Sequence, residues 1–431
     1  MYLDLIEKNN PALIRAAVDL HQSGAIPANT YVIDLGTVRR NARAMAQEAA
    51  RVGLRLYLMT KHFNRNPLVT SAALAQGLDS TVAVDVQCAL NLARFDLPVG
   101  HVGHLVQIPR HSLDRVLRMN PEVMTVFSVE KAAQVSEAAV RLGRVQDVMV
   151  RVRGPEDIIY PNEEGGIREE DLETAAKAIG ALAGVRLAGV VTFPGTLYNT
   201  RSRRMETTAN FETLLRARER LLEWGFDVTH VNGPGASCTE GFAVVAEAGG
   251  TVAEPGHALT GTTPSTLFNP EAIERQAIAY VSEVSHLFDG KAYVFGGGFY
   301  ACDTPANVGD DHAFHTNAWT PRALVGRRPE SVFSTKVPVD VGSFFGRTNN
   351  ATDYYGGTLL PEGPSDIQVG DTVVYGFRPQ VFTTRAFVAV LDDVDSTPRV
   401  LGVFDRANNV LNDDLEPCDD TRARVREMVA L

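Results

Sequence analysis

The chain has 431 residues, of which 45% are hydrophobic and 22% are charged, as is typical of globular proteins with more than one simple core. The formal net charge of -11 argues against nucleic acid or an acidic membrane surface as the main partner, because both need a basic surface. Four scattered cysteines without a CxxC pair indicate neither a disulfide framework nor a zinc knot. The polar N-terminus and the lack of an apolar run of about 20 residues predict a cytoplasmic protein without a signal peptide or membrane span.

A helical lead-in and a single strand are predicted at the start of the chain. Residues 1–29 form the lead-in, in which an amphipathic helix follows Pro11, and residues 30–35 form a short separate strand. From residue 54 to about residue 254, short apolar runs then alternate with helical patterns. The helical patterns cover 68–77, 129–142, 169–183 and 203–224.

The apolar runs predict eight β-strands. They span 54–59, 80–84, 102–107, 123–127, 147–152, 187–193, 228–231 and 251–253. Alternating strands and helices imply parallel pairing with right-handed crossovers, and eight such units close naturally into a (β/α)8 barrel of the TIM type. We therefore expect an α/β fold with this barrel at 30–270, and an open doubly wound sheet is the competing fold.

The pattern of apolar and polar residues changes after about residue 270. Alternating segments with glycine and proline between them predict a C-terminal, mostly-β domain at 271–431. These segments are 277–286, 292–296, 337–341, 372–377, 386–391 and 399–404, and a short helix is predicted at 418–429.

Catalytic groups of a barrel lie just past the C-terminal ends of its strands, so the residues that follow each run are the candidates. Lys61 follows the first run. A lysine that is desolvated in a barrel mouth favours the neutral amine that a Schiff base needs. A solvated loop lysine is the alternative, and position alone favours that alternative.

A glycine-rich turn follows the seventh run, at residues 232–239. Gly233 and Gly235 allow backbone N–H groups to approach a ligand, while Ser237 and Thr239 add hydroxyl groups. A helical pattern follows at 238–248, and such a turn before a helix N-terminus suits a phosphate. An ordinary turn between strand and helix is an equally good interpretation.

Glu254 and four histidines are the remaining candidates. A carboxylate such as Glu254, at the end of the eighth run, stabilises a protonated pyridine nitrogen, although it can also cap the barrel rim. His101 and His104 are expected to point to opposite faces of a strand. His312 and His315 suit one helix face, but no neighbouring ligands complete a metal set, so no metal site is predicted.

The order of these features resembles the fold-type III pyridoxal phosphate enzymes. The strand at 31–35 with Arg40 and Asn41, then Lys61, the glycine-rich turn and Pro255-Gly256 carry the resemblance over roughly 30–400. The family includes alanine racemase, D-threonine aldolase, D-serine dehydratase and the eukaryotic-type ornithine decarboxylases. In detail the chain is most similar to the YhfX-like branch, which is usually described as amino acid racemases.

This resemblance implies pyridoxal 5'-phosphate as cofactor and assigns roles to the candidates. Lys61 is the implied Schiff-base lysine, and Glu254 faces the pyridine nitrogen. The remaining implied cofactor contacts are Arg153, Tyr198, Asn232, Gly233, Gly235, Ser237, Thr239, Gly256 and His257. Arg347 is a candidate for the substrate carboxylate, and a surface arginine is an equally good interpretation. Gln380 and Phe382 stand where aldolases and dehydratases of the family place metal ligands, which disfavours a metal-assisted reaction.

The reaction implied is racemisation or epimerisation of an amino acid in a homodimer with shared active sites. Lys61 takes the α-proton on one face, and Tyr300, or alternatively Cys302, returns a proton on the other. The pair Cys302-Asp303 is also similar to one in the decarboxylases, so a decarboxylase of basic amino acids is the nearest alternative. A non-catalytic cofactor carrier and a barrel hydrolase without the cofactor are the alternatives from other classes.

Overall fold

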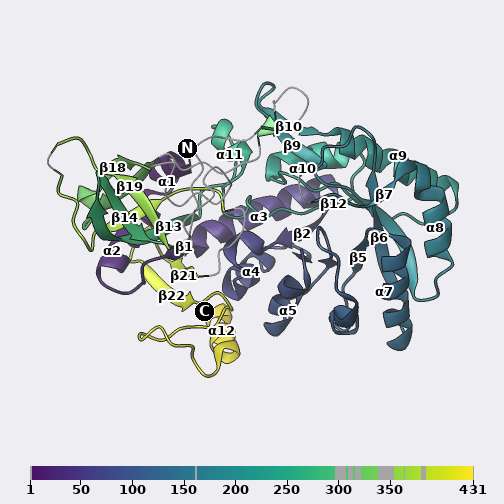
Figure 1. Ribbon diagram of the computed structural model, residues 1–431, viewed down its shortest axis with the longest axis horizontal. Helices are drawn as coiled ribbons and strands as arrows, with labels where there is room; N and C mark the ends of the chain where they lie inside the picture. Colours follow the sequence, from purple (N-terminus) through teal and green to yellow (C-terminus); the bar gives the residue numbers. More distant parts are fainter. Residues whose placement is uncertain are drawn as a thin grey trace.

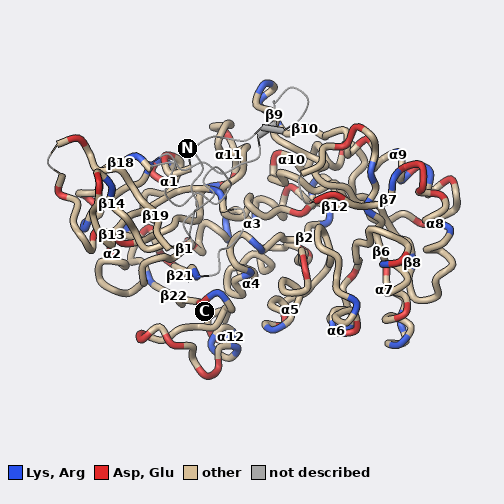
Figure 2. Tube along the Cα trace, in the orientation of Figure 1, with Lys and Arg blue, Asp and Glu red and all other residues tan. Residues whose placement is uncertain are grey.

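The computed structural model describes residues 2–160, 163–296, 307–308, 314–315, 322–337, 354–363, 365–379 and 385–430. Two large sheets dominate it: a closed barrel at one end and a second sheet at the other, with the long helix α3 (Leu35–Val52) between them (Figure 1). Acidic and basic residues are interspersed along the whole trace (Figure 2).

The barrel confirms the predicted (β/α)8 fold. Its strands are all parallel, and the ring closes where β12 pairs with β2 and β5 pairs with β6. In ring order the strands are β2 (Arg55–Met59), β3 (Ser80–Ala83), β4 (His101–Val102), β5 (Val123–Val126), β6 (Gln146–Arg153), β8 (Val185–Val191), β11 (His230–Asn232) and β12 (Val252–Ala253). A separate buried cluster that includes Tyr57, Val82 and Met149 comes from alternate positions of these strands, as expected for a filled barrel interior.

The helices that follow the strands begin and end at identifiable caps. Asp85 accepts a hydrogen bond from the Cys88 amide at the start of α5, and Gly53 ends α3 in the left-handed conformation at φ 75°. The other barrel helices are α4 (Pro67–Leu74), α5 (Val86–Arg94), α6 (Leu113–Leu117), α7 (Val129–Arg141), α8 (Leu172–Gly180), α9 (Ala209–Glu223) and α10 (Thr239–Glu247). The helix predicted at 203–224 was too long, because β10 (Arg204–Thr207) pairs with β9 (Thr196–Asn199) before α9 begins.

The second sheet is mostly antiparallel and confirms the predicted C-terminal β fold. Its strands are β1 (Thr30–Asp34), β13 (Ile278–Phe288), β14 (Lys291–Phe295), β17 (Arg322–Gly326), β18 (Phe333–Lys336), β19 (Tyr355–Leu359), β20 (Thr372–Tyr375), β21 (Phe387–Asp392) and β22 (Arg399–Phe404). Strand β18 precedes the segment predicted at 337–341, while β17 and β19 were not predicted. The predicted boundaries near residues 29 and 270 stay predictions.

The N-terminus belongs to the second sheet in space. β1 lies between β13, to which it is antiparallel, and β21, to which it is parallel. Helices α1 (Tyr2–Asn9) and α2 (Pro11–Gln22) bury apolar side chains against this sheet in a core distinct from that of the barrel. The strand predicted at 30–35 is therefore present, but only tertiary pairing shows where it lies.

Shorter elements complete the described part of the chain. They are β7 (Ile167–Arg168), β15 (Asn307–Val308), β16 (Phe314–His315), α11 (Pro264–Phe268), α12 (Thr421–Ala430) and the 3-10 turns η1 (Lys61–Phe63), η2 (Arg110–Ser112), η3 (Glu169–Asp171) and η4 (Pro329–Ser331). His315 thus lies in a strand rather than on the predicted helix face, and His312 lies outside the described residues. None of the described helices is both long and apolar enough to cross a bilayer.

Candidate active site

A cavity opens at the C-terminal ends of the barrel strands, where the second sheet meets the barrel. Six of the residues predicted for the site line it: Lys61, Gly235, Ser237, Glu254, Gly256 and His257. They come from the segments after β2, β11 and β12, which are neighbours in the ring although distant in sequence. Two residues that were not assigned to the site, His104 and Arg378, also line the cavity.

Lys61 begins the turn η1 directly after β2. The chain then reverses through Asn64 and Arg65, both at positive φ, and Asn66 caps α4 by accepting from two backbone amides. This compact turn holds the lysine at the strand end. Burial is the main cause that lowers the pKa of Lys61, although nearby Glu163 opposes it. The neutral amine is therefore populated at lower pH than in a solvated lysine.

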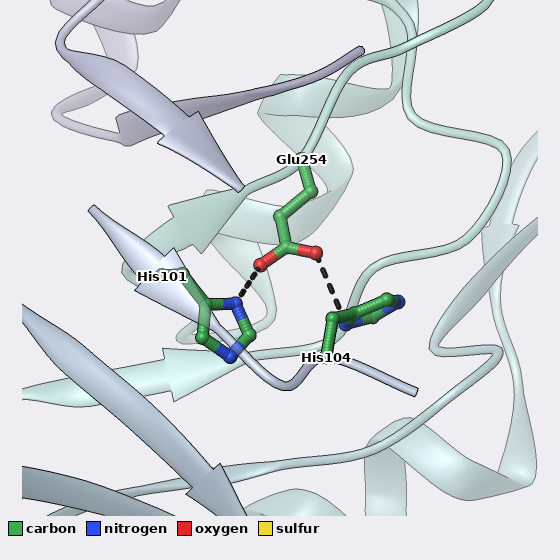
Figure 3. Close-up of side chains that lie close together, drawn as sticks. All are labelled: His101, His104 and Glu254. Atoms are coloured by element: carbon green, nitrogen blue, oxygen red, sulfur yellow. Dashed lines mark hydrogen bonds and ion pairs between the residues drawn. The ribbon is translucent and has the colours of Figure 1, made fainter. Parts of the chain in front are cut away.

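Glu254 lies between His101 and His104 (Figure 3), and Asn232 is a further neighbour of its carboxylate. Its Oε1 is 2.5 Å from His101 Nδ1, and the Asn232 amide donates to the same oxygen at 2.7 Å. Its Oε2 lies 3.1 Å from His104 Nδ1. Burial opposes ionisation of the carboxyl, but the two imidazoles and the hydrogen bonds outweigh this and hold the pKa of Glu254 below its usual range. The group is thus a buried carboxylate, not a rim cap.

The prediction that His101 and His104 point to opposite faces was wrong. Strand β4 ends at Val102, and Gly103 turns the chain at φ 81°, so the period of two no longer applies. His104 consequently turns back toward the same carboxylate as His101. The spacing of three residues with a glycine between them was the signal available in the sequence.

The glycine-rich turn suits a phosphate through its backbone. A Cβ on Gly235 would lie 1.9 Å from the Thr196 carbonyl oxygen, so only glycine permits this close approach. The Ala236 amide donates to that oxygen, while within the described residues no hydrogen bond engages the amides of Gly235 and Ser237. Those two amides precede the N-terminus of α10 and are available to an anion.

Three other residues of the turn have different surroundings. Asn232 is directed to Glu254, and Gly233 packs so closely on Phe211 of α9 that a Cβ would lie 2.6 Å from its ring. The amide and hydroxyl of Thr239 both donate to Glu274 at 2.7 Å. Thr239 is therefore already paired with a buried carboxylate.

The remaining predicted residues divide into those that are described but do not line the cavity and those outside the described chain. Tyr198 is buried in β9 and stacks on Phe268 with ring centroids 5.8 Å apart, and Arg153 is buried at the end of β6. Neither is among the described residues that line the cavity. The other predicted positions lie outside the described residues: Tyr300, Cys302, Asp303, Arg347, Gln380 and Phe382.

The second sheet contributes to the cavity through the segment after β20. Arg378 is 8% exposed and lines the cavity, and the neighbouring Pro379 carbonyl lies 2.5 Å from His257 Nε2. His257 in turn stacks on His62, with ring centroids 4.4 Å apart. Barrel and sheet thus build one site, a relation that the sequence does not show because Arg378 and Lys61 are far apart in the chain.

Acidification is expected to destabilise the protein before its carboxylates protonate. Burial lowers the pKa of His62 to about 3 and that of His21 to about 4, so between these values and about 6.5 the unfolded chain binds more protons. Stability contributed by the neutral rings is therefore lost as pH falls. The melting temperature should drop between about pH 7 and pH 5, and His62→Phe should reduce the drop. Exposed His111→Gln is the control; a flat profile for the unmodified protein would contradict this account.

Comparison with known proteins agrees with this architecture. Residues 33–264 match the family model of the alanine racemase N-terminal domain, and residues 279–400 match the YhfX-like C-terminal domain. The uncharacterized protein YhfX of Escherichia coli (strain K12) is 36% identical over 413 residues, which cover 95% of this chain and 100% of that protein. The chain belongs to the YhfX family. Its barrel is thus of the alanine racemase type, as in the fold-type III pyridoxal phosphate enzymes.

Solved structures show the same fold for this YhfX-family chain. D-threonine aldolase from Filomicrobium marinum aligns with a TM-score of 0.62 at 15% identity, covering 88% of this chain and 95% of that one. Alanine racemase from Clostridium difficile 630 gives 0.59 at 15% identity, covering 88% and 99%. D-threo-3-hydroxyaspartate dehydratase from Delftia sp. HT23 gives 0.62 at 18% identity, covering 88% and 97%. These enzymes catalyse different reactions, so the YhfX-family fold does not by itself select one.

Proposed function

We propose that this protein is a pyridoxal 5'-phosphate-dependent amino acid racemase or epimerase. The observation that carries the proposal is a lysine with a lowered pKa in the same cavity as a buried carboxylate and a glycine-rich turn. This combination offers an amine, a negative charge and backbone amides to one ligand.

The residues present fit that cofactor. The amides of Gly235 and Ser237 are available to its phosphate, Lys61 to its aldehyde, and Glu254 to its pyridine nitrogen. Glu254 Oε2 is buried, and its one close polar neighbour in the described structure is His104 Nδ1 at 3.1 Å, without hydrogen-bond geometry, so this acceptor also suits a nitrogen that carries a proton. When bound, the cofactor supplies an electron sink for the α-carbon of the substrate.

The protein's own groups then move the proton. The neutral Lys61 Nζ is the base that takes the α-proton, because its environment disfavours the ammonium form. Tyr300 is our proposed acid on the opposite face, with Cys302 as the second choice, both supplied by a partner subunit. The homodimer is part of this proposal, and a molar mass of one chain by light scattering at assay concentration would contradict it.

A decarboxylase is the second candidate, favoured by the buried carboxylate of Glu254, which is our proposed partner of the pyridine nitrogen. The test incubates the cofactor-loaded protein with amino acids of both hands in heavy water, followed by chiral analysis and measurement of carbon dioxide. Exchange with inversion supports the racemase, and carbon dioxide release supports the decarboxylase. Absence of both with every amino acid in a broad panel would favour a non-catalytic cofactor carrier.

Arg378 is our proposed ligand for an anionic group of the substrate. Arg378 lines the cavity and is largely buried, whereas Arg347 lies outside the described residues. Replacing Arg378 with glutamine should raise KM by roughly 10- to 100-fold, because a hydrogen bond to a charged group contributes about 1.5–3 kcal/mol. The kcat should change less. Arg385→Gln, in the turn just before β21, is the control, and a loss confined to kcat would refute the binding role.

A further inference from the structure

We propose that His101 and Thr125 form, together with Glu254, a buried relay that positions this carboxylate toward the cavity. The relay rests on the proposed function, since its purpose is to keep a proton on the pyridine nitrogen of the cofactor. His101 and Thr125 are positioning residues, because they act through Glu254. Neither was predicted for the site, and both come from barrel strands, β4 and β5.

The geometry of the relay is continuous. His101 is fully buried, with Nδ1 at 2.5 Å from Glu254 Oε1 and Nε2 at 2.7 Å from Thr125 Oγ1. An ionised carboxylate only accepts hydrogen bonds, so the Nδ1 atom of His101 donates to it. The Thr125 hydroxyl then fixes the other ring nitrogen, as second partners of histidines commonly fix ring orientation. Both ring nitrogens are engaged, which locks the imidazole in place.

Two residues of the relay, His101 and Glu254, form with His104 a candidate metal cluster by residue type, but the distances favour a relay. His101, His104 and Glu254 offer one ligand atom each within 4.8 Å of one another. Ligand atoms that share a tetrahedral zinc ion lie roughly 3.3 Å apart, given metal–ligand distances of about 2.0–2.1 Å. The 2.5 Å between His101 Nδ1 and Glu254 Oε1 is too short for that. A metal ion would also have to replace the hydrogen bond that His101 donates to the carboxylate.

The two carboxylate oxygens of Glu254 have different roles in the relay. Oε1 accepts hydrogen bonds from His101 and Asn232, and these two bonds fix its position. Oε2 lies 3.1 Å from Nδ1 of His104, which lines the cavity, and this contact lacks hydrogen-bond geometry in the described structure. A fixed, negatively charged oxygen at that point retains the proton of a ring nitrogen, and a protonated ring is the stronger electron sink.

Four variants separate the steps of the relay. His101→Leu removes the donor to Glu254, whereas His101→Asn keeps an amide near the Nδ1 position and loses the contact to Thr125. Thr125→Val removes the hydroxyl, and Thr125→Ser is its matched control. The primary readout is nitrogen-15 NMR of cofactor labelled at the ring nitrogen, which reports protonation without turnover. The second is the dissociation constant of the cofactor, and the third is the tautomer of His101 in the cofactor-free protein.

We expect His101→Leu to lower the protonated fraction of the ring nitrogen and to weaken cofactor binding by about tenfold, the loss of one charge-assisted hydrogen bond. Thr125→Val should show a smaller change in the same direction, with Thr125→Ser and His101→Asn close to the unmodified protein. An unchanged ring nitrogen in folded His101→Leu overturns the proposal, as does stoichiometric zinc binding that requires His101, His104 and Glu254. If the unmodified protein binds no cofactor, both the proposed function and the proposed purpose of the relay are wrong. The tautomer of His101 still shows in that case whether the hydrogen bonds of the relay exist.

Discussion

Replacing Lys61 with alanine is expected to abolish the visible absorption of the cofactor-loaded protein and to lower turnover by at least about 10³-fold. The reason is that, in our proposal, the same amine both binds the cofactor covalently and accepts the α-proton. Because burial lowers the pKa of Lys61, the unmodified protein should also keep its covalent link at a pH where solvated lysines are charged. Borohydride reduction followed by peptide mapping should place the cofactor on Lys61.

Lys177→Ala is the matched control for this experiment. Lys177 lies on helix α8 and forms an exposed ion pair with Glu173, so its loss should change neither absorption nor turnover. Label on another lysine, or full absorption in Lys61→Ala, would remove the central residue from the proposal. Circular dichroism of both variants shows whether each still folds.

Glu254→Gln is expected to lower kcat by roughly 10²- to 10³-fold, the range found when a preorganised electrostatic contact is removed from a reacting centre. Glutamine keeps the shape of the side chain but not its charge, so the pyridine nitrogen would lose the partner that we propose to hold its proton. The surroundings that hold the pKa of Glu254 below its usual range also make the ionised form stabilising above that range. A lower melting temperature near neutral pH should therefore accompany the loss of activity.

A second buried carboxylate separates the catalytic effect from the effect on stability. Asp371, in the second sheet, is 2% exposed and ion-paired with Arg327, against 4% exposure for Glu254. Asp371→Asn should lower the melting temperature and leave kcat nearly unchanged. If Glu254→Gln lost no more kcat than Asp371→Asn, the carboxylate would have only a structural role.

The relation between barrel and second sheet explains why one cavity holds all these groups. The barrel supplies Lys61, the glycine-rich turn and Glu254, while the sheet supplies Arg378 and the carbonyl that meets His257. The candidate catalytic groups on the barrel follow its strand ends, and the segment after β20 of the second sheet lines the same cavity. We therefore expect changes in the segment after β20 to affect substrate binding more than cofactor attachment.

The sequence by itself was enough to predict the barrel and several of the residues that line the cavity at its mouth. Helix and strand have periods of 3.6 and 2 residues, so alternating patterns reveal local structure, and parallel strands bring their C-terminal ends to one rim. Lys61, Gly235 and Glu254 follow such strands and line one cavity. These inferences needed only local patterns and the rule that catalytic groups follow strands.

Only the tertiary structure decided the contacts between segments that are distant in the chain. β1 inserts between β13 and β21, and Arg378 reaches the cavity from the second sheet. His101 and His104 converge on Glu254 because Gly103 breaks the strand after Val102. Pairing partners and backbone reversals of this kind depend on which surfaces meet after the chain has folded, and local periodicity carries no information about them.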